Sequence, residues 1–332
     1  MHHSEEDMYE NKFAILSFFI FFLSKMLSLG LSLPGGPGDT KDNAYEIWDK
    51  IHWIEFGDSL YSDEYKPLID RWHIDKYFSL MQDINDINVP IGSIDAYLYS
   101  DGKKIDVVMD YTGLFTSVLL SGIERTVYGL ILDGYLSGWG VGGIISGLAS
   151  RYGRPPPTAT HCINNATLVS INPYNGNVGG IANSNYGTIS HCLNNGSVTG
   201  VDMVAGIAAT NLGYILNSIN TGKVTASISE PNALDWWNYQ GAAGISVLHQ
   251  GNLSNCINLG DIVGYDYVSG IVSAAYSGGY MVIVTNSINA GYIKGNKYVG
   301  SILGYGNIHI TNCINTGVVE GMEDVGAIVG KE

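Results

Sequence analysis

Two His–Cys dipeptides carry the side chains that most often bind zinc. They are His161–Cys162 and His191–Cys192, and imidazole and thiolate are both good Zn²⁺ ligands. Neighbouring side chains of a strand point to opposite faces, however, so a histidine and the cysteine after it do not face the same ion. Four further copies of the motif hold Asn in place of the histidine. The pattern favours a solvent-facing polar row, and we expect no metal site.

A glycine-rich stretch has the spacing of a dinucleotide-binding loop. Gly138, Gly140 and Gly143 in GWGVGG satisfy G-x-G-x-x-G. A dinucleotide site also needs a helix directly after the loop and an acidic residue about 20 positions later. The residues that follow predict a strand, so we expect no cofactor.

Catalysis on a parallel β-helix needs two carboxylates, or an Asp and a basic residue, on one face. The charged residues of the repeat region stand at different repeat positions, and no clustered pair emerges from them. They are Asp202, Lys223, Asp261, Asp266, Lys294, Lys297 and Glu320. We therefore expect no catalytic residues and a protein that is not an enzyme.

An aromatic insert is the best candidate for binding. Trp236, Trp237 and Tyr239 interrupt the repeats on a predicted loop, and Tyr267 and Tyr298 stand at equivalent positions of adjacent repeats. Aromatic faces stack well against sugar rings or a protein partner. The alternative is that the insert folds back and covers the edge of a coil. We take these five residues as the predicted ligand-binding set.

The composition excludes several classes of protein. Hydrophobic residues make up 45% of the 332 residues and charged residues 14%, which argues against global disorder. The formal net charge of -15 argues against nucleic-acid or anionic-membrane partners, since both require a basic face. Residues 1–140 carry 10 Lys/Arg and 22 Asp/Glu, against 6 and 9 in 141–332. This shift predicts a change of organisation near residue 140.

The N-terminal segment predicts export. The stretch 13–24 (FAILSFFIFFLS) is uncharged, too short to span a bilayer comfortably and typical of a secretory signal. Gly30 and Ser32 have the spacing of a cleavage site, although the segment before the apolar run is acidic. A cleaved signal, an uncleaved anchor and a buried helix remain the alternatives. The expected location is extracellular or the cell surface, with no other membrane contact.

Internal repeats decide the predicted fold. One signature reads VGGI at 141–144 and 178–181 and VAGI at 204–207; another reads HCINNA at 161–166, HCLNNG at 191–196 and NSINTG at 217–222. Together they define a unit of 26 residues, lengthened by inserts in some copies. Each unit splits into three short β-like segments separated by Gly and Asn, without helical periodicity. We predict an all-β parallel β-helix (β-solenoid) whose coils stack at about 4.8 Å.

Stacking such units turns each repeat position into a ladder along the axis. Stacked amides can hydrogen-bond along the axis, and the predicted amide ladder is Asn164, Asn194, Asn220, Asn258, Asn289 and Asn315. The predicted small-residue ladder is Cys162, Cys192, Ser218, Cys256, Ser287 and Cys313. Its mixture of Cys and Ser favours free thiols, with a Cys162–Cys192 disulfide as the alternative. Corner positions with positive φ are predicted for Gly196, Gly222, Gly260, Gly291 and Gly317.

These signatures resemble the GLUG-motif repeats of bacterial surface and secreted proteins, including the non-catalytic part of IgA-specific metalloproteases. The segment 77–115 is similar to the family's leading strands and turn at Leu80–Ile84, Pro90–Gly92 and Gly113–Phe115, and departs from it at 97–101. The resemblance implies a surface location and a role in adhesion or spacing. It implies no chemistry, since the protease activity of some relatives needs a His-Glu-x-x-His helix, which this sequence does not contain.

The segment 42–57 predicts a helix that caps the first coil. Asp42 or Asn43 would begin it and Gly57 would end it, with Ile47, Ile51 and Ile54 on one face beside Trp48. The predicted divisions are a signal at 1–33, a linker and cap at 34–76, irregular coils at 77–140 and regular repeats at 141–332.

The predicted function is a secreted or surface adhesin-like binding or spacer module, with a glycan or a cell-surface protein as partner. The alternatives are a carbohydrate-active β-helix enzyme and the N-terminal part of a larger surface protein. The open last coil predicts a protein that is mainly monomeric at neutral pH. We expect self-association once Glu320, Glu323 and Asp324 are protonated.

Overall fold

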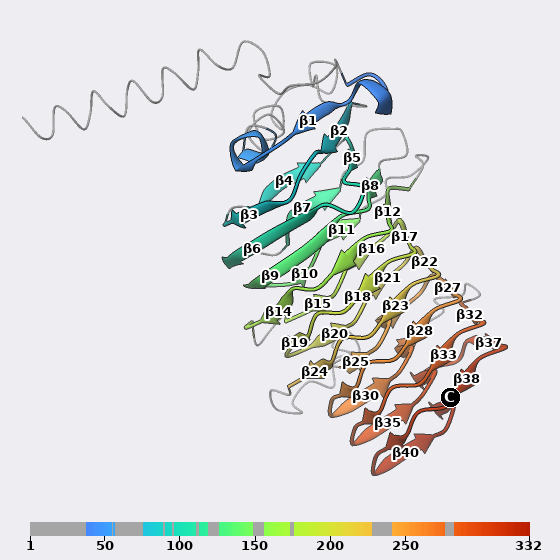
Figure 1. Cartoon of the computed structure of the whole chain (residues 1–332). Helices are drawn as coiled ribbons and strands as arrows, with labels where there is room; N and C mark the ends of the chain where they lie inside the picture. Colours follow the sequence, from blue (N-terminus) through green and yellow to red (C-terminus); the bar gives the residue numbers. More distant parts are fainter. Residues whose placement is uncertain are drawn as a thin grey trace, which may run out of the picture.

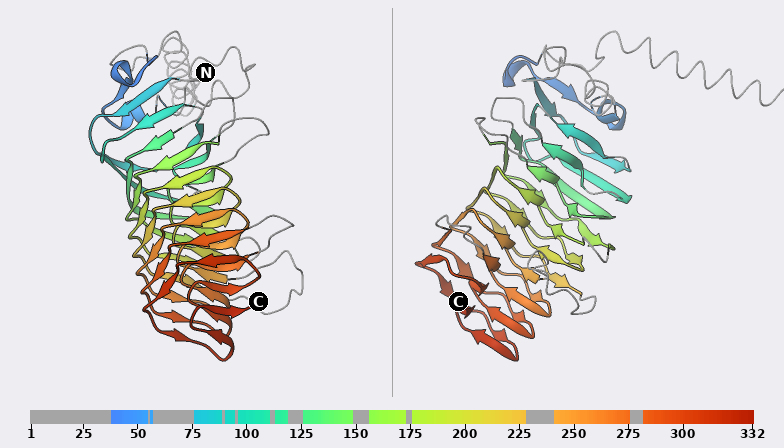
Figure 2. Two further views of the ribbon diagram at one scale, coloured as in Figure 1. Left: turned by 90° about the vertical axis from the view of Figure 1, so that its right-hand side faces the viewer. Right: turned by 180° about the vertical axis from the view of Figure 1, so that it is seen from behind.

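The computed structural model describes residues 38–54, 56, 76–88, 90–94, 96–110, 113–118, 126–148, 156–172, 176–227, 241–275 and 282–332. The predicted signal segment and the aromatics Trp236, Trp237 and Tyr239 lie outside the described residues. The described chain forms a parallel β-solenoid, which confirms the predicted fold class. Its coils stack along one axis, with the first and last coils at opposite ends (Figure 1). Figure 2 shows the same stack from two further sides.

Four sheets run along the solenoid, and every described strand pair within them is parallel. Sheet A contains, in order, β1 (Tyr45–Ile47), β2 (Tyr77–Leu80), β5 (Tyr97–Tyr99), β8 (Thr126–Tyr128), β12 (Thr158–Thr160), β17 (Thr188–Ser190), β22 (Tyr214–Leu216), β27 (Asn252–Ser254), β32 (Ile283–Thr285) and β37 (His309–Thr311).

Sheet B begins with β3 (Ile84–Ile87), β6 (Lys104–Asp110) and β9 (Ile131–Gly138), and then divides into two rows. The first row is β13 (Ile163–Asn164), β18 (Leu193–Asn194), β23 (Ile219–Asn220), β28 (Ile257–Asn258), β33 (Ile288–Asn289) and β38 (Ile314–Asn315). The second is β14 (Thr167–Ser170), β19 (Val198–Gly200), β24 (Val224–Ala226), β29 (Ile262–Val263), β34 (Ile293–Lys294) and β39 (Val319–Glu320).

Sheet C contains β4 (Ile91–Ile94), β7 (Phe115–Val118), β11 (Ile145–Leu148), β16 (Ala182–Asn185), β21 (Ala208–Asn211), β26 (Ser246–His249), β31 (Val272–Ala275), β36 (Leu303–Tyr305) and β41 (Val329–Lys331). Sheet D contains β10 (Val141–Gly142), β15 (Val178–Gly179), β20 (Met203–Ala205), β25 (Gly241–Ala243), β30 (Asp266–Ser269), β35 (Lys297–Gly300) and β40 (Glu323–Gly326).

A regular coil therefore has five short strands, where three segments were expected. The division of sheet B explains part of the difference. β9 pairs with both β13 and β14, so two strands of the later coil replace one long strand. In the later coil, Oδ1 of Asn164 accepts a hydrogen bond from the backbone N–H of Ala166 at 3.1 Å. That bond turns the chain, whereas β9 has Leu132 at this position and continues as one strand to Gly138.

The predicted corner glycines have a different role from the one expected. Positive φ among the described glycines occurs at Gly38, Gly102, Gly129, Gly134, Gly140 and Gly306, so the prediction for the repeat glycines was wrong. The repeat glycines are required by close packing instead. A Cβ on Gly222 would lie 2.0 Å from the carbonyl oxygen of Gly196, and the other repeat glycines are equally crowded.

The N-terminal cap also differs from the prediction. Tyr45–Ile47 is strand β1, paired with β2, and it follows the short 3-10 helix η1 (Lys41–Asn43). Helical residues are 50–54 and 56, and Oδ1 of Asp49 caps them by accepting from the N–H groups of Ile51 and His52. Pairing with an open sheet edge thus overrides local helix propensity here.

The side of the helix that faces the core was also predicted wrongly. Ile51 and Ile54 are 66% and 46% exposed, whereas Trp53 and Phe56 are buried. Phe56 packs on Phe78 with 4.6 Å between ring centroids, and Trp53 packs on Phe115 at 5.9 Å. These aromatic side chains cover the first coils.

One apolar core runs through the solenoid. The isoleucines that end the VGGI-type signatures stack into a further ladder, the Ile ladder. It is fully buried in six coils, at Ile144, Ile181, Ile207, Ile245, Ile271 and Ile302. Its last member, Ile328, is 36% exposed because it belongs to the final described coil. Among the residues that the structure describes, none forms an apolar helix long enough to cross a membrane.

Candidate functional site

The amide ladder lies inside the solenoid. Each Asn donates from Nδ2 to Oδ1 of the next, over 2.7 to 2.9 Å, through Asn164, Asn194, Asn220, Asn258, Asn289 and Asn315. The first five are fully buried. Because every donor points the same way along the axis, the row has a polarity. Its role is structural, since a ligand in solution does not reach the buried amides.

The cysteines lie beside this ladder as free thiols. Cys162, Cys192 and Cys256 are buried, and Cys313 in the last coil is half-buried. Burial raises the pKa of Cys256 to about 12 and also raises the pKa of Cys192. A neutral buried thiol is a poor nucleophile, so the row fits packing better than chemistry.

A second interior ladder was missed in the sequence. Asn185 donates to Asn211 Oδ1 at 2.6 Å, and Nδ2 of Asn211 lies 3.0 Å from Nδ1 of His249. His249 is fully buried, and within the described structure its Nε2 has no hydrogen-bond partner. Burial lowers its pKa to about 4, so the imidazole is neutral near pH 7. The signal was available, because Asn185 and Asn211 both lie four positions after the repeat Ile.

The residues before the Cys/Ser ladder form a row on the outside, which we name the corner column. His161, His191, Asn217, Asn255, Asn286 and Asn312 have φ between 49° and 56°. This left-handed conformation favours Asn and His over most other residues with a side chain, which explains why these two types recur there. The imidazoles of His161 and His191 stack at 4.9 Å, and Nδ2 of Asn217 lies 3.1 Å from Nε2 of His191.

Aromatic residues continue this row into the first coils. The ring of Tyr128 lies 5.0 Å from that of His161, and Tyr99 lies 5.7 Å from Tyr128. The Lys41 ammonium lies 4.5 Å from the Tyr99 ring centroid, a cation–π distance. Sequence reasoning missed Tyr99 and Tyr128. Aligning VYGLIL (127–132) with ATHCIN (159–164) would have placed Tyr128 and the corner residue Gly129 in the repeat.

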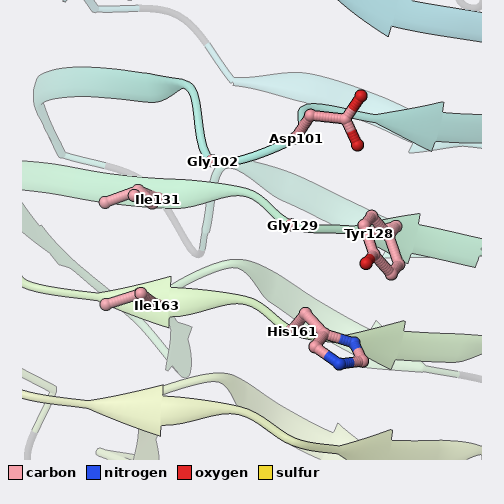
Figure 3. Close-up of a pocket in the computed structure, with 7 residues that line it drawn as sticks. All are labelled: Asp101, Gly102, Tyr128, Gly129, Ile131, His161 and Ile163. Carbon is pink, nitrogen blue, oxygen red and sulfur yellow. The ribbon is translucent and has the colours of Figure 1, made fainter.

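A depression of about 330 Å³ opens on the surface where these rows meet. Asp101, Tyr128 and His161 lie one after another along one side of it, and Ile131 and Ile163 lie along the other (Figure 3). Gly102 and Gly129 lie between the two columns. The described residues contain no group of three or more His, Cys, Asp or Glu side chains that would hold a metal ion. The depression therefore offers separate polar groups and an aliphatic wall.

A second outer corner carries the predicted aromatic pair. The rings of Tyr267 and Tyr298 lie 4.8 Å apart, and Tyr305 joins them at 5.6 and 5.1 Å. Tyr267 and Tyr298 have φ of 52° and 56°, an unusual conformation for a bulky side chain. Lys297 and Lys331 place their ammonium groups 4.9 and 5.7 Å from the Tyr298 centroid. We name these three tyrosines the tyrosine cluster.

The tyrosine cluster lies beside Gly241, the first described residue after the predicted aromatic insert. The described chain resumes at Gly241, where a Cβ would lie 2.5 Å from the backbone oxygen of Tyr267. Tyr239 stands only two residues before Gly241 in the sequence.

The charged residues lie in columns, which corrects the expectation of scattered positions. Asp266, Lys297 and Glu323 are register partners in three successive coils, and Lys297 Nζ lies 2.6 Å from Glu323. Lys294 is the register partner of Glu320, and Val224 N–H donates to Asp261, which puts Lys223 level with Asp261. Opposite charges thus alternate between neighbouring coils, an arrangement that stabilises cross-strand pairing.

Comparisons with known proteins found a likeness to a solved structure. No family model and no curated protein matches the chain. Among solved structures, the chain is similar to a crystal structure described as a putative immunoglobulin A1 protease from Bacteroides ovatus. The identity is 16% and the TM-score 0.46, over 89% of this chain and 84% of the other.

Proposed function

We propose that this chain is a GLUG-like repeat β-solenoid that serves as a non-enzymatic, adhesin-like binding or spacer module. We further propose that it is secreted or displayed on a cell surface, and that it binds a glycan or a cell-surface protein. The observation that carries the proposal is the tyrosine cluster on the outside of a rigid stack.

Three features of the tyrosine cluster support binding. Tyr267, Tyr298 and Tyr305 are partly exposed, and rings at differing angles present both edges and faces to a partner. Tyr267 and Tyr298 keep a strained backbone conformation in adjacent coils, and such strain concentrates at functional positions. Lys297 and Lys331 lie beside the Tyr298 ring, each in an ion pair with a carboxylate, so charged groups border the rings.

The charged columns favour binding over catalysis. Lys297 already forms an ion pair with Glu323, and Lys294 lies level with Glu320. A β-helix glycosidase would instead need two carboxyl groups across a groove, roughly 5 to 9.5 Å apart. We therefore propose that these charges stabilise the stack.

The test uses substitutions that the backbone accepts. Asn adopts the left-handed conformation readily and already does so in the corner column, so the double variant Tyr267→Asn/Tyr298→Asn should fold. We expect it to lose at least tenfold in binding to cultured cells or a glycan array, since ring stacking contributes about 1–3 kcal/mol. The matched control is Tyr186→Asn, at a tyrosine that is 46% exposed elsewhere. Equal binding by the double variant and the parent would refute the role of the cluster.

A further inference from the structure

The depression in Figure 3 arises from a gap in the corner column. Gly129 N–H donates to Thr160, and His161 N–H donates to Ser190, so Gly129 occupies the position that His161 takes one coil later. Gly129 has φ of 71° and keeps the left-handed corner without a side chain. One coil of the column therefore lacks a side chain, and a Cβ at Gly129 would lie 3.2 Å from the backbone nitrogen of Asp101. The next six coils carry His or Asn there.

Polar groups of three kinds surround this gap. The exposed Asp101 carboxylate lies one coil before Gly129 and the His161 imidazole one coil after it, on the same side of the depression. Nδ1 of His161 is held by Thr160 Oγ1 at 2.9 Å, so Nε2 is the ring nitrogen that can meet a ligand. The Tyr128 ring lies between them, and its hydroxyl can both donate and accept.

The opposite wall is aliphatic. Ile131 and Ile163 are register partners of adjacent coils and line the depression with half-buried side chains. A volume of about 330 Å³ is at the lower end of the range for small-molecule sites, which suits one ring rather than a chain. The ligand should thus have hydroxyl groups on one edge and a C–H surface on the other.

We propose that this depression binds a single neutral pyranose, such as the end of a glycan chain. The Asp101 carboxylate accepts hydrogen bonds from sugar hydroxyls, His161 and Tyr128 complete the polar side, and Ile131 and Ile163 contact the C–H face. Acidic sugars are disfavoured by the carboxylate and by the formal charge of -15 on the chain. The proposal rests on the proposed function in that it names the ligand class of a binding module.

The experiment titrates the full chain with methyl pyranosides of glucose, galactose, mannose and N-acetylglucosamine, followed by saturation-transfer NMR. Methyl N-acetylneuraminate is the acidic comparison. We expect at least one neutral pyranoside to bind and the acidic one not to bind. Gly129→Asn adds the side chain that Asn217 carries at the same corner, and its Cβ would also press on the Asp101 backbone at 3.2 Å. It should lower the affinity at least tenfold, because it occupies the depression and displaces one of its polar groups. Asp101→Asn keeps the shape and should lower it roughly tenfold, through loss of charge-assisted hydrogen bonds.

A matched control separates a filled pocket from a damaged fold. Asn255→Gly alters the same column in a coil distant from the depression, so it should leave pyranoside binding unchanged. Thermal melting reports whether Gly129→Asn folds; if it does not, Asp101→Asn alone decides the outcome. The inference fails if none of the neutral pyranosides binds at tens of millimolar, or if a folded Gly129→Asn binds like the parent.

The same variants distinguish this inference from the proposed function. Tyr267→Asn/Tyr298→Asn should keep pyranoside binding, because the tyrosine cluster lies in later coils on another sheet. Pyranoside binding that survives in a folded Gly129→Asn, beside cell binding that is lost in the tyrosine variant, would overturn this inference alone.

Discussion

The side-chain amide of Asn220 donates a hydrogen bond to Oδ1 of Asn258 over 2.8 Å, although 38 residues separate them in the chain. The same amide donates to the carbonyl of Gly222 at 3.0 Å, and Oδ1 of Asn220 accepts from Asn194 at 2.8 Å. Asn220 is fully buried. Both donors and the acceptor are thus used, and each coil satisfies the amide of the coil before it.

Replacing Asn220 should therefore destabilise the stack. Asn220→Leu keeps a similar volume but removes one of the two acceptors of the Asn194 amide, which keeps only the Gly196 carbonyl, and removes the Asn220 donor from the side-chain carbonyl of Asn258 in the core. We expect a loss of about 1–3 kcal/mol in the free energy of unfolding, measured by urea denaturation. Asn195→Leu is the control, at an exposed Asn of the preceding coil, and should change stability by less than about 0.5 kcal/mol. Equal effects would show that the buried ladder adds nothing specific.

A substitution in the repeat glycines should be severe for a steric reason. A Cβ on Gly222 would approach the Gly196 carbonyl oxygen to 2.0 Å, so Gly222→Ala forces adjacent coils apart. We expect a loss of at least about 2 kcal/mol. Gly147→Ala is the matched control, since a Cβ there meets nothing within 4 Å. A thermal melt that is unchanged for Gly222→Ala would contradict the packing argument.

The fold could be predicted because stacked coils repeat the same environment. Asn at one position and Cys or Ser at another recur wherever adjacent coils offer the same neighbours, so periodicity alone identifies the solenoid. The corners were assigned wrongly because glycine has two uses. In this chain the repeat glycines avoid a clash, while His and Asn take the left-handed corner.

The first coils could not be predicted to the same extent. Tyr45–Ile47 becomes a strand because β2 presents an open edge in register, and such a partner is not visible in a local pattern. Tyr128 and Gly129 take the places of Thr160 and His161, two substitutions that hide the repeat. The candidate pyranose site lies where the repeat is least regular, and for that reason the sequence did not reveal it.

His249 should make stability depend on pH. Burial lowers its folded pKa from 6.5 to about 4, so the unfolded chain takes up the proton more readily than the folded one. The stabilisation is present above about pH 6.5 and is lost as the pH falls toward 4, by about 2 kcal/mol between pH 7 and pH 5. The direction of the ladder also favours the neutral form of His249, because Nδ1 of the imidazole faces the Nδ2 donor of Asn211.

The variant His249→Asn removes this titration and continues the amide row of Asn185 and Asn211. We expect the difference in unfolding free energy between pH 7 and pH 5 to shrink by about 2 kcal/mol relative to the parent. His161→Asn is the control, because His161 is exposed and its corner tolerates Asn in four other coils. A parent and a His249→Asn variant with parallel pH profiles would mean that His249 is not buried as described.

The four thiols should differ in reactivity. Burial raises the pKa of Cys192, Cys256 and Cys313, but Cys313 in the last described coil is only half-buried, so a reagent reaches it more easily than the buried thiols. In the native protein one thiol should react quickly with a disulfide reagent, and the others should react only on unfolding. Cys313→Ser should remove the fast phase, whereas Cys256→Ser should retain it. Both variants should fold, because Ser218 and Ser287 occupy the same ladder position in other coils. Denaturation without reductant should release four thiols, and recovery of two would indicate a disulfide.

The last described coil exposes apolar side chains beside open strand edges. Ile314, Val318 and Met322 are 53%, 59% and 88% exposed, and β37 to β41 each pair with a described strand on one side only. The acidic residues nearby are less repulsive than the sequence suggested. Glu323 pairs with Lys297 and Asp324 with Lys331, while Glu320 accepts a hydrogen bond from Tyr292.

For the chain of residues 1–332, these edges predict self-association through the last described coil as the net charge falls. At neutral pH the charge of -15 keeps molecules apart, and near the isoelectric point of about 4.8 that repulsion disappears. An unpaired, apolar edge is then free to pair with a second copy. We expect light scattering to show mainly monomer at pH 7 and a larger species near pH 5. Val318→Lys/Met322→Lys should stay monomeric at both, because lysine remains charged and protects an edge. The control Ile171→Lys changes a side chain that is 65% exposed far from that end, and it should still associate. If the control and the edge variant behave alike, the association is a general effect of low charge rather than a property of the last coil.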